Sequence, residues 1–239
     1  MTDSETLRRN IAAVRRRIQA ACDRSGRDPG DVLLVAVTKT VSVDVIVEAR
    51  SQGVDDFAEN YASELVAKAP LVEATWHFIG KVQRGTAHHV ADHSDVIHSA
   101  EPGRALERIG RRAASVGKRI RCLLQVDYTE LRQGLRPEDV PGAVEACSSL
   151  DGIVVAGLMT LPPWLGDPEA TRPFFAHLRI LRDRIRSAHP GVVELSMGMS
   201  GDYEVAVEEG ATMVRIGTAL FGPSPVQRLP GDASPGEDR

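Results

Sequence analysis

The chain of 239 residues is long enough for one large hydrophobic core, and single α/β barrels commonly have about 250 residues. Hydrophobic residues make up 42% and charged residues 26%, which is ordinary for a globular protein. The net charge of −4 argues against a general nucleic-acid binder, because such a protein needs a basic surface. Cys22, Cys122 and Cys147 form no CxxC pair, and no signal-type or long apolar run is present. We therefore expect a cytoplasmic protein with reduced thiols and no membrane segment.

The first predicted element is an N-terminal helix. Its apolar residues recur at steps of three and four and form one stripe: Leu7, Ile11, Val14, Ile18 and Ala21 or Cys22. Turn residues at 25–30 end the helix. The arginines lie largely off the stripe, at Arg8, Arg9, Arg15, Arg16 and Arg17. They indicate a solvated helix face, with a patch for an anionic partner as the alternative.

Short apolar segments then alternate with helical patterns. The expected strands are Val32–Thr38, Asp56–Glu59, Thr75–Ile79, Val96–Ser99, Ile120–Val126, Ile153–Thr160, Val192–Ser196 and Thr212–Ile216. The expected helices between them include Val43–Ser51, Arg104–Val116, Phe174–Ala188 and Tyr203–Glu209. This alternation predicts a single (β/α)8 TIM-type barrel with an extra N-terminal helix over residues 1–222. A doubly wound open sheet is the alternative, but no GxGxxG or P-loop follows the first strand. Residues 223–239, rich in Pro, Gly and acids, are expected to be a disordered tail.

Lys39 is the first candidate for chemistry because it ends the first strand. The carboxyl ends of barrel strands are where such folds keep their functional residues. Val35, Val37 and Lys39 share one side of the strand, so Lys39 points into the barrel mouth if these positions face inward. A partly desolvated lysine can condense with an aldehyde. A lysine that only snorkels at a strand end is the alternative.

Two glycine-containing turns near the end of the chain predict an anion site. Arg215 lies inside the last apolar strand, where a buried guanidinium needs an anion or another acceptor. Gly217 and Thr218 follow with amides and a hydroxyl, at the position of the usual barrel phosphate site. Residues 196–202 place further glycines and serines before a helix, although Ser200 or Asp202 could serve only as an N-cap. Together with Lys39, these turns suggest a phosphorylated aldehyde or ketone bound as an imine.

The histidines give a weaker signal. His77 could bind a metal, but no convergent ligand set accompanies it in the sequence, which favours a satisfied core histidine. His88 or His89 with His93 has helix-face spacing for a metal, but lacks an HExxH-type glutamate. We therefore expect no metal site.

Five segments together resemble a known family. They are residues 36–39 (Ala-Val-Thr-Lys), 58–61 (Ala-Glu-Asn-Tyr), 76–80 (Trp-His-Phe-Ile-Gly), 195–200 (Leu-Ser-Met-Gly-Met-Ser) and 213–222 (Met-Val-Arg-Ile-Gly-Thr-Ala-Leu-Phe-Gly). In this order they resemble the pyridoxal phosphate homeostasis proteins, the YggS-like (PROSC) family related to the N-terminal barrel of alanine racemase. The resemblance departs after Gly80, where the family usually has a proline, and here Lys81 is a second amine near the mouth.

The resemblance implies a fold-type III barrel with pyridoxal 5′-phosphate (PLP) on Lys39 as an internal aldimine. It implies phosphate contacts from Ser200, Gly201, Gly217 and Thr218, and places Arg215 near the pyridine nitrogen, with Asn60 beside the cofactor and Met199 lining the pocket. It also implies a protein that buffers or delivers PLP in vitamin B6 homeostasis without firm turnover, with apo PLP-dependent enzymes as transient partners. A monomer is expected, because the racemase's β-domain partner has no counterpart in the sequence.

Two other functions stay open at this point. One is a small PLP-dependent amino-acid racemase or lyase, although nothing in the sequence places Tyr61, Tyr128 or Tyr203 as a second base. The other is a Schiff-base aldolase acting on sugar phosphates, which would hold no chromophore.

Overall fold

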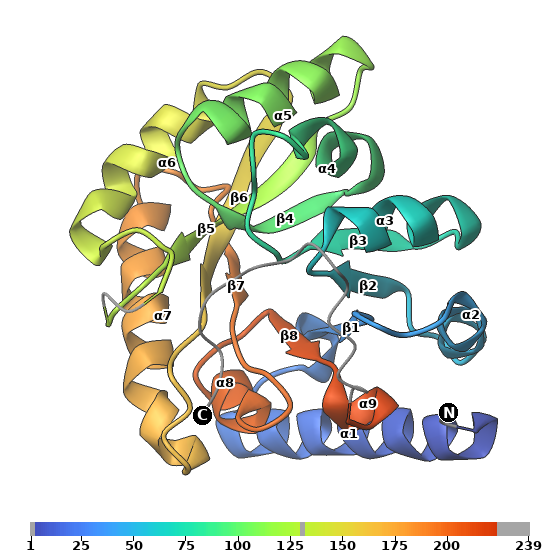
Figure 1. Ribbon diagram of the computed structural model, residues 1–239. Coiled ribbons are helices and arrows are strands. Elements are labelled where there is room, and N and C mark those ends of the chain that lie inside the picture. Colours follow the sequence, from blue (N-terminus) through green and yellow to red (C-terminus); the bar gives the residue numbers. More distant parts are fainter. Residues whose placement is uncertain (1–2, 130–131, 224–239) are drawn as a thin grey trace.

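Eight parallel strands close into one barrel in which every strand is hydrogen-bonded to its neighbours in chain order. The computed structural model describes residues 3–129 and 132–223, and the strands enclose the centre of the molecule in Figure 1. The strands are β1 (Leu33–Val37), β2 (Asp56–Glu59), β3 (Thr75–Phe78), β4 (Val96–Ala100), β5 (Ile120–Val126), β6 (Ile153–Thr160), β7 (Glu194–Ser196) and β8 (Met213–Ile216). The pairing of β1 with β8, which aligns Val35 with Arg215, completes the closure. The predicted (β/α)8 barrel is confirmed.

Helices surround the barrel in the order that the sequence predicts. They are α1 (Ser4–Ser25), α2 (Val43–Ser51), α3 (Ala62–Lys68), α4 (Ala87–His93), α5 (Arg104–Ser115), α6 (Val140–Ser148), α7 (Arg172–Arg186), α8 (Tyr203–Glu208) and α9 (Thr218–Phe221). Short 3-10 turns are η1 (Pro29–Asp31), η2 (Ala69–Leu71), η3 (Pro137–Asp139) and η4 (Pro168–Thr171). The short helices α3, α6 and α9 were not among the predicted elements. No helix of the described residues combines the length and apolar character that a membrane crossing requires.

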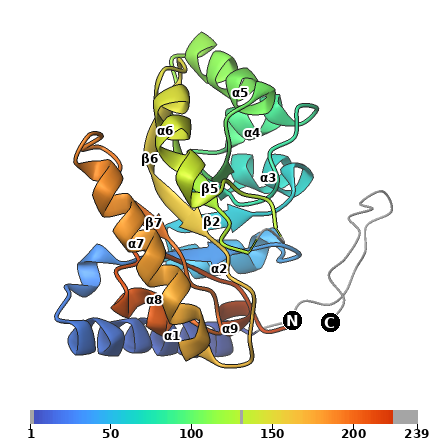
Figure 2. The ribbon, with the colours of Figure 1, turned by 90° about the vertical axis from the view of Figure 1, so that its left-hand side faces the viewer.

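The N-terminal helix packs outside the barrel along α8 and α9, as both ribbon views show (Figures 1 and 2). Asp3 caps its start by accepting a hydrogen bond from the amide of Thr6 at 2.7 Å. Gly26 ends it at φ 67°, a left-handed conformation that glycine adopts without steric cost. The predicted apolar stripe is buried, and Arg17 pairs with Glu204 of α8.

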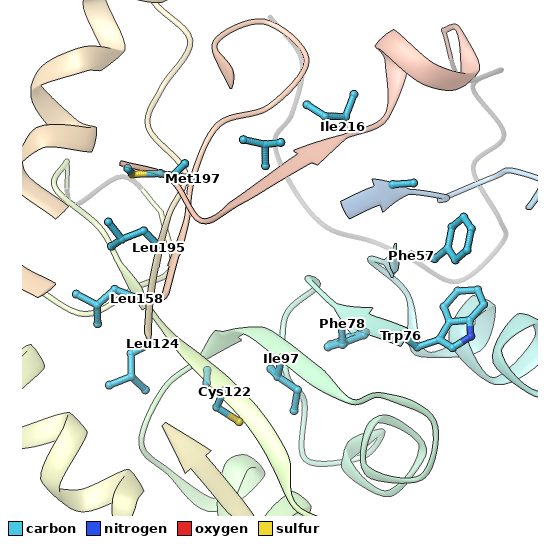
Figure 3. Close-up of a cluster of buried hydrophobic side chains, with 14 of the residues drawn as sticks. Phe57, Trp76, Phe78, Ile97, Cys122, Leu124, Leu158, Leu195, Met197 and Ile216 are labelled. Carbon is cyan, nitrogen blue, oxygen red and sulfur yellow. The ribbon is translucent and has the colours of Figure 1, made fainter. Parts of the chain in front are cut away.

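Side chains alternate between two environments along each strand. One set packs between the barrel and the helices, and its members drawn in Figure 3 include Phe57, Trp76 and Phe78. The other set fills the barrel interior with Val35, Ala58, Val96, Leu123, Met159 and Met213. Cys22, Cys122 and Cys147 are buried and free, as expected.

Because the strand period is two residues, the interior set fixes which polar side chains also point inward. Asp56, His77, His98, Ser196 and Arg215 share the interior parity of their strands. The expected tail begins at Pro223, and its residues 224–239 lie outside the described residues.

Candidate functional site

Lys39 lies in the turn that follows β1, at the carboxyl end of the barrel. Its side chain is exposed, which differs from the partly desolvated amine that the sequence suggests. The turn carries the residue past the end of the strand. Thr40 adopts φ 63°, which is uncommon for a β-branched residue and indicates a backbone held by its surroundings.

A buried polar cluster from β2 and α3 holds both sides of Lys39. The ammonium of Lys68 donates to the carbonyl oxygen of Thr38 at 2.8 Å and to Glu59 Oε1 at 2.8 Å. The amide of Thr40 donates to Glu64 Oε2 at 2.9 Å, and Lys68 also contacts that carboxylate. The residues before and after Lys39 are therefore fixed by one ion-paired cluster.

Burial raises the pKa of Glu59 to about 7, although Lys68 and the Thr38 hydroxyl both favour its charged form. The Thr38 hydroxyl donates to Glu59 Oε1 at 2.6 Å. The other carboxyl oxygen of Glu59 is buried with no hydrogen-bond partner among the described residues, which adds to the cost of its charge. The cluster thus combines tight geometry with a titratable group near neutral pH.

The turn after β7 presents free backbone donors. Asp202 accepts a hydrogen bond from the amide of Met199 at 2.7 Å, which holds the turn. The hydroxyl of Ser200 accepts one from the amide of Ala219 at 3.3 Å, which joins this turn to α9. Over the described part of the chain, the amides of Ser200 and Gly201 donate to no protein acceptor. Asp202 occupies the N-cap position of α8 but makes no side-chain cap hydrogen bond, so its carboxylate holds the turn and does not cap the helix.

The turn after β8 lies against the end of β1. A Cβ atom placed on Gly217 would come 3.5 Å from Cβ of Val37, two residues before Lys39. Within the described ranges, the amides of Gly217 and Thr218 also have no protein acceptor. Unpaired amides at a helix start favour an anion, so the donors of both turns fit a phosphate group. The two turns and the Lys39 strand share one end of the barrel, as expected.

Arg215 lies inside the barrel and is only 4% exposed. Its guanidinium donates to the hydroxyl of Ser196 and, at 3.0 Å, to the carbonyl oxygen of Thr160. Burial lowers the pKa of Arg215 to about 10, so the group stays cationic at neutral pH. The acceptors that the sequence required for a buried arginine are present.

The remaining predicted residues lie on the neighbouring turns. Asn60 follows β2 and is partly buried, and Gly80 packs so closely that an added Cβ would lie 1.8 Å from the carbonyl oxygen of Asn60. Met199 is 40% exposed. An added Cβ on Gly201 would meet the indole ring of Trp164 at 3.0 Å, so this exposed tryptophan from the β6–α7 loop lies over the turn. Sequence reasoning did not identify Trp164.

His77 is a satisfied core histidine, as the sequence favours. Its Nε2 lies 2.9 Å from Asp56 Oδ1 and its Nδ1 lies 2.7 Å from His98 Nε2. Sequence reasoning missed these two partners, which belong to other strands. Among the described residues, no three His, Cys, Asp or Glu side chains are grouped so that they could hold a metal ion. His88, His89 and His93 therefore belong to no such group.

Tyr128 and Lys81 bear on the alternative functions, as a possible second base and a second amine. Tyr128 packs against Phe174 and His177 of α7, on the outside of the barrel. Lys81 is exposed after β3 and is a second amine on the carboxyl side of the barrel.

The barrel and its carboxyl-end site define an alanine racemase-type barrel protein, because residues 3–225 match the family described as "Alanine racemase, N-terminal domain". The pyridoxal phosphate homeostasis protein of Aquifex aeolicus is 38% identical, over 89% of this chain and 96% of that protein. The chain therefore belongs to the pyridoxal phosphate homeostasis protein family.

Two solved structures have a similar fold. PipY of Synechococcus elongatus, solved with PLP bound, is 33% identical with a TM-score of 0.79, covering 90% of this chain and 100% of PipY. Alanine racemase of Clostridium difficile shares the fold at 18% identity, with a TM-score of 0.72. Its alignment covers 92% of this chain and 57% of the racemase.

Proposed function

We propose that this chain binds PLP at the carboxyl end of its barrel and serves in cellular PLP homeostasis, buffering or delivering the cofactor. The observation that carries this proposal is the meeting of three elements at one mouth. The strand that precedes Lys39 lies against the Gly217 turn, and Ser200 joins the second turn to α9. An amine for the aldehyde and free amides for the phosphate thus belong to the same end of the barrel.

Each predicted residue has a role that its position suits. Lys39 would hold PLP through its amine, and PLP would supply an aldehyde to which an amine can bind reversibly. Ser200, Gly201, Gly217 and Thr218 hold the phosphate, and Arg215 faces the ring nitrogen. Asn60 would lie beside the cofactor, and Met199 would help to line the pocket. A reversible link without a fixed second base suits a carrier more than an enzyme.

The chemistry of Arg215 supports the carrier role. PLP stabilises negative charge on a bound amino acid best when its ring nitrogen is protonated. A guanidinium can only donate hydrogen bonds, so a ring nitrogen beside Arg215 must accept one and stay unprotonated. We also propose that residues 1–222 act as one PLP-binding domain, that the protein is a cytoplasmic monomer, and that apo PLP-dependent enzymes are transient recipients.

An absorbance spectrum of the purified protein with added PLP, with and without Lys39→Ala, tests this function. Wild-type protein is expected to gain the band of lysine-bound PLP, and the variant to lack it. A wild type that gains no such band would overturn the proposal. Transfer to an apo-enzyme no faster than from free PLP would overturn the delivery role alone.

A further inference from the structure

A continuous chain of hydrogen bonds crosses the barrel interior beneath the proposed cofactor site. It starts at Asp56 at the amino end of β2 and passes through His77 of β3 and His98 of β4. His98 Nδ1 then lies 2.7 Å from the Oγ of Ser196 on β7, across the lumen. Ser196 in turn accepts from Arg215 of β8. Five side chains from five strands thus connect the two ends of the barrel.

The chemistry of the two ends favours one arrangement of the protons in this chain. Arg215 can only donate, so Ser196 accepts from it, and in the favoured arrangement Ser196 donates its own proton to His98 Nδ1. The proton of His98 then lies on Nε2 and is donated to His77 Nδ1. The proton of His77 also lies on Nε2.

The other end of the chain agrees with this direction. His77 Nε2 donates a hydrogen bond to Asp56 Oδ1, and a carboxylate oxygen can only accept such a bond unless it is protonated. Burial and the nearby cations lower the pKa of His98 well below its ordinary value, so this ring is neutral at neutral pH. In this arrangement every hydrogen bond is donated in the direction from Arg215 towards Asp56. Each of the three residues between them accepts one hydrogen bond and donates one.

The two ends differ in their access to solvent. His77, His98 and Ser196 are fully buried, whereas Asp56 borders a cavity of about 380 Å³. This cavity lies at the amino end of β1 and β2 and is also lined by Arg15 and Asp55. The carboxylate therefore borders the cavity while it orients a series of polar groups in the buried interior.

We propose that Asp56, His77, His98 and Ser196 are positioning residues that lock Arg215 as a fixed hydrogen-bond donor. The inference rests on the proposed function, because Arg215 faces the ring nitrogen only if PLP binds there. The chain is a scaffold and not a proton path, since a guanidinium does not release its proton near neutral pH. Its effect is to keep the ring nitrogen an acceptor, which holds the cofactor in a weakly reactive state.

The wild-type protein without PLP tests the chain directly. Protein labelled with ¹⁵N-histidine is examined by NMR at neutral pH, with signals assigned by His77→Gln and His98→Gln. His98 is expected to be neutral and protonated at Nε2, so that it donates to His77 Nδ1. A proton on His98 Nδ1 would overturn the inference, and this result does not depend on PLP binding.

A variant pair tests the effect on the cofactor. In Asp56→Asn the amide oxygen still accepts from His77, so the charge is lost while the contact remains. Asp55→Asn is the matched control, because Asp55 is an exposed neighbour that pairs with Arg50. We expect about ten-fold weaker PLP binding and a shifted absorbance band for Asp56→Asn only, as for a weakened charge-assisted hydrogen bond.

The outcomes separate the two proposals. Wild-type protein that binds PLP, with Asp56→Asn unchanged in affinity and spectrum, would overturn the scaffold and leave the proposed function standing. Wild-type protein that binds no PLP would overturn the proposed function, and the tautomer measurement would still decide the chain. If Asp56→Asn does not fold, the same measurement decides.

Discussion

The ammonium of Lys68 lies 2.8 Å from the carbonyl oxygen of Thr38, the residue just before Lys39. Lys68 belongs to α3 and Thr38 follows β1, so a helix on the outside of the barrel fixes the turn that carries the reactive amine. The same ammonium pairs with Glu59 and Glu64, and Glu64 holds the amide of Thr40. The position of Lys39 therefore depends on a cluster that includes none of the residues proposed to contact PLP.

Replacing Lys68 with Met should destabilise the protein and weaken PLP binding together. The variant leaves the carboxylate of Glu59 buried without its cation, which costs about 3 kcal/mol or more for a broken buried pair. Urea unfolding measures the loss, and titration with PLP measures the affinity. Lys81→Met is the control, because that side chain is exposed. Equal stability of the Lys68 and Lys81 variants would contradict the role of the cluster.

The raised pKa of Glu59 predicts a pH dependence of stability. Between the ordinary glutamate pKa of 4.5 and the folded value of about 7, the native protein binds more protons than the unfolded chain. Stability from this group is therefore present at low pH and is lost as the pH rises through 7, at no more than about 1.4 kcal/mol per pH unit.

Glu59→Gln isolates this contribution, because the amide does not titrate. Unfolding free energies of wild type and variant at pH 5.5 and 7.5 give the comparison. Relative to the variant, wild-type protein should lose stability at the higher pH. A difference that stays constant, or that changes in the opposite direction, is inconsistent with a buried Glu59 of raised pKa.

Gly80→Ala should be strongly destabilising, because the added Cβ would lie 1.8 Å from the carbonyl oxygen of Asn60. Backbone atoms of two adjacent strand ends would have to separate, which also displaces Asn60 from the site. We expect a loss of roughly 3 kcal/mol or a failure to fold, as for severe overpacking. Gly85→Ala, in the same loop with no atom within 4 Å of the added Cβ, should keep wild-type stability.

Trp164→Ala should speed the release of PLP with little change in stability, because the ring is exposed and lies over Gly201. Loss of this cover predicts release that is roughly two- to ten-fold faster. Release is followed by absorbance with an excess of an apo-enzyme as trap. Leu71→Ala, an equally exposed apolar truncation on η2, is the control. The same release rate in the wild type and in both variants would show that Trp164 does not cover the bound PLP.

Much of the barrel could be predicted because each strand is a short apolar run between turns. The bounds of β2, β5 and β6 match the prediction to the residue. The strands β1, β3, β7 and β8 were predicted one or two residues too long, and β4 one residue too short. The burial of Arg215 was also expected, because this residue lies inside the last apolar strand.

Other features could not be predicted, since they depend on closure. His98 and Ser196 are 98 residues apart and meet only across the barrel lumen. Lys68 of α3 meets Thr38 after β1 only in the folded protein. Lys39 is exposed because it lies in the turn beyond the end of β1. No periodicity in the sequence encodes such contacts.

Borohydride reduction of the PLP-loaded protein, followed by peptide mass mapping, tests the central claim most directly. Reduction makes the link between PLP and its lysine permanent, so the modified residue can be read from the peptides. The account predicts one pyridoxyl group on Lys39 and none on Lys81, with the mark absent from Lys39→Ala. A mark on Lys81, or none on any lysine, would contradict it.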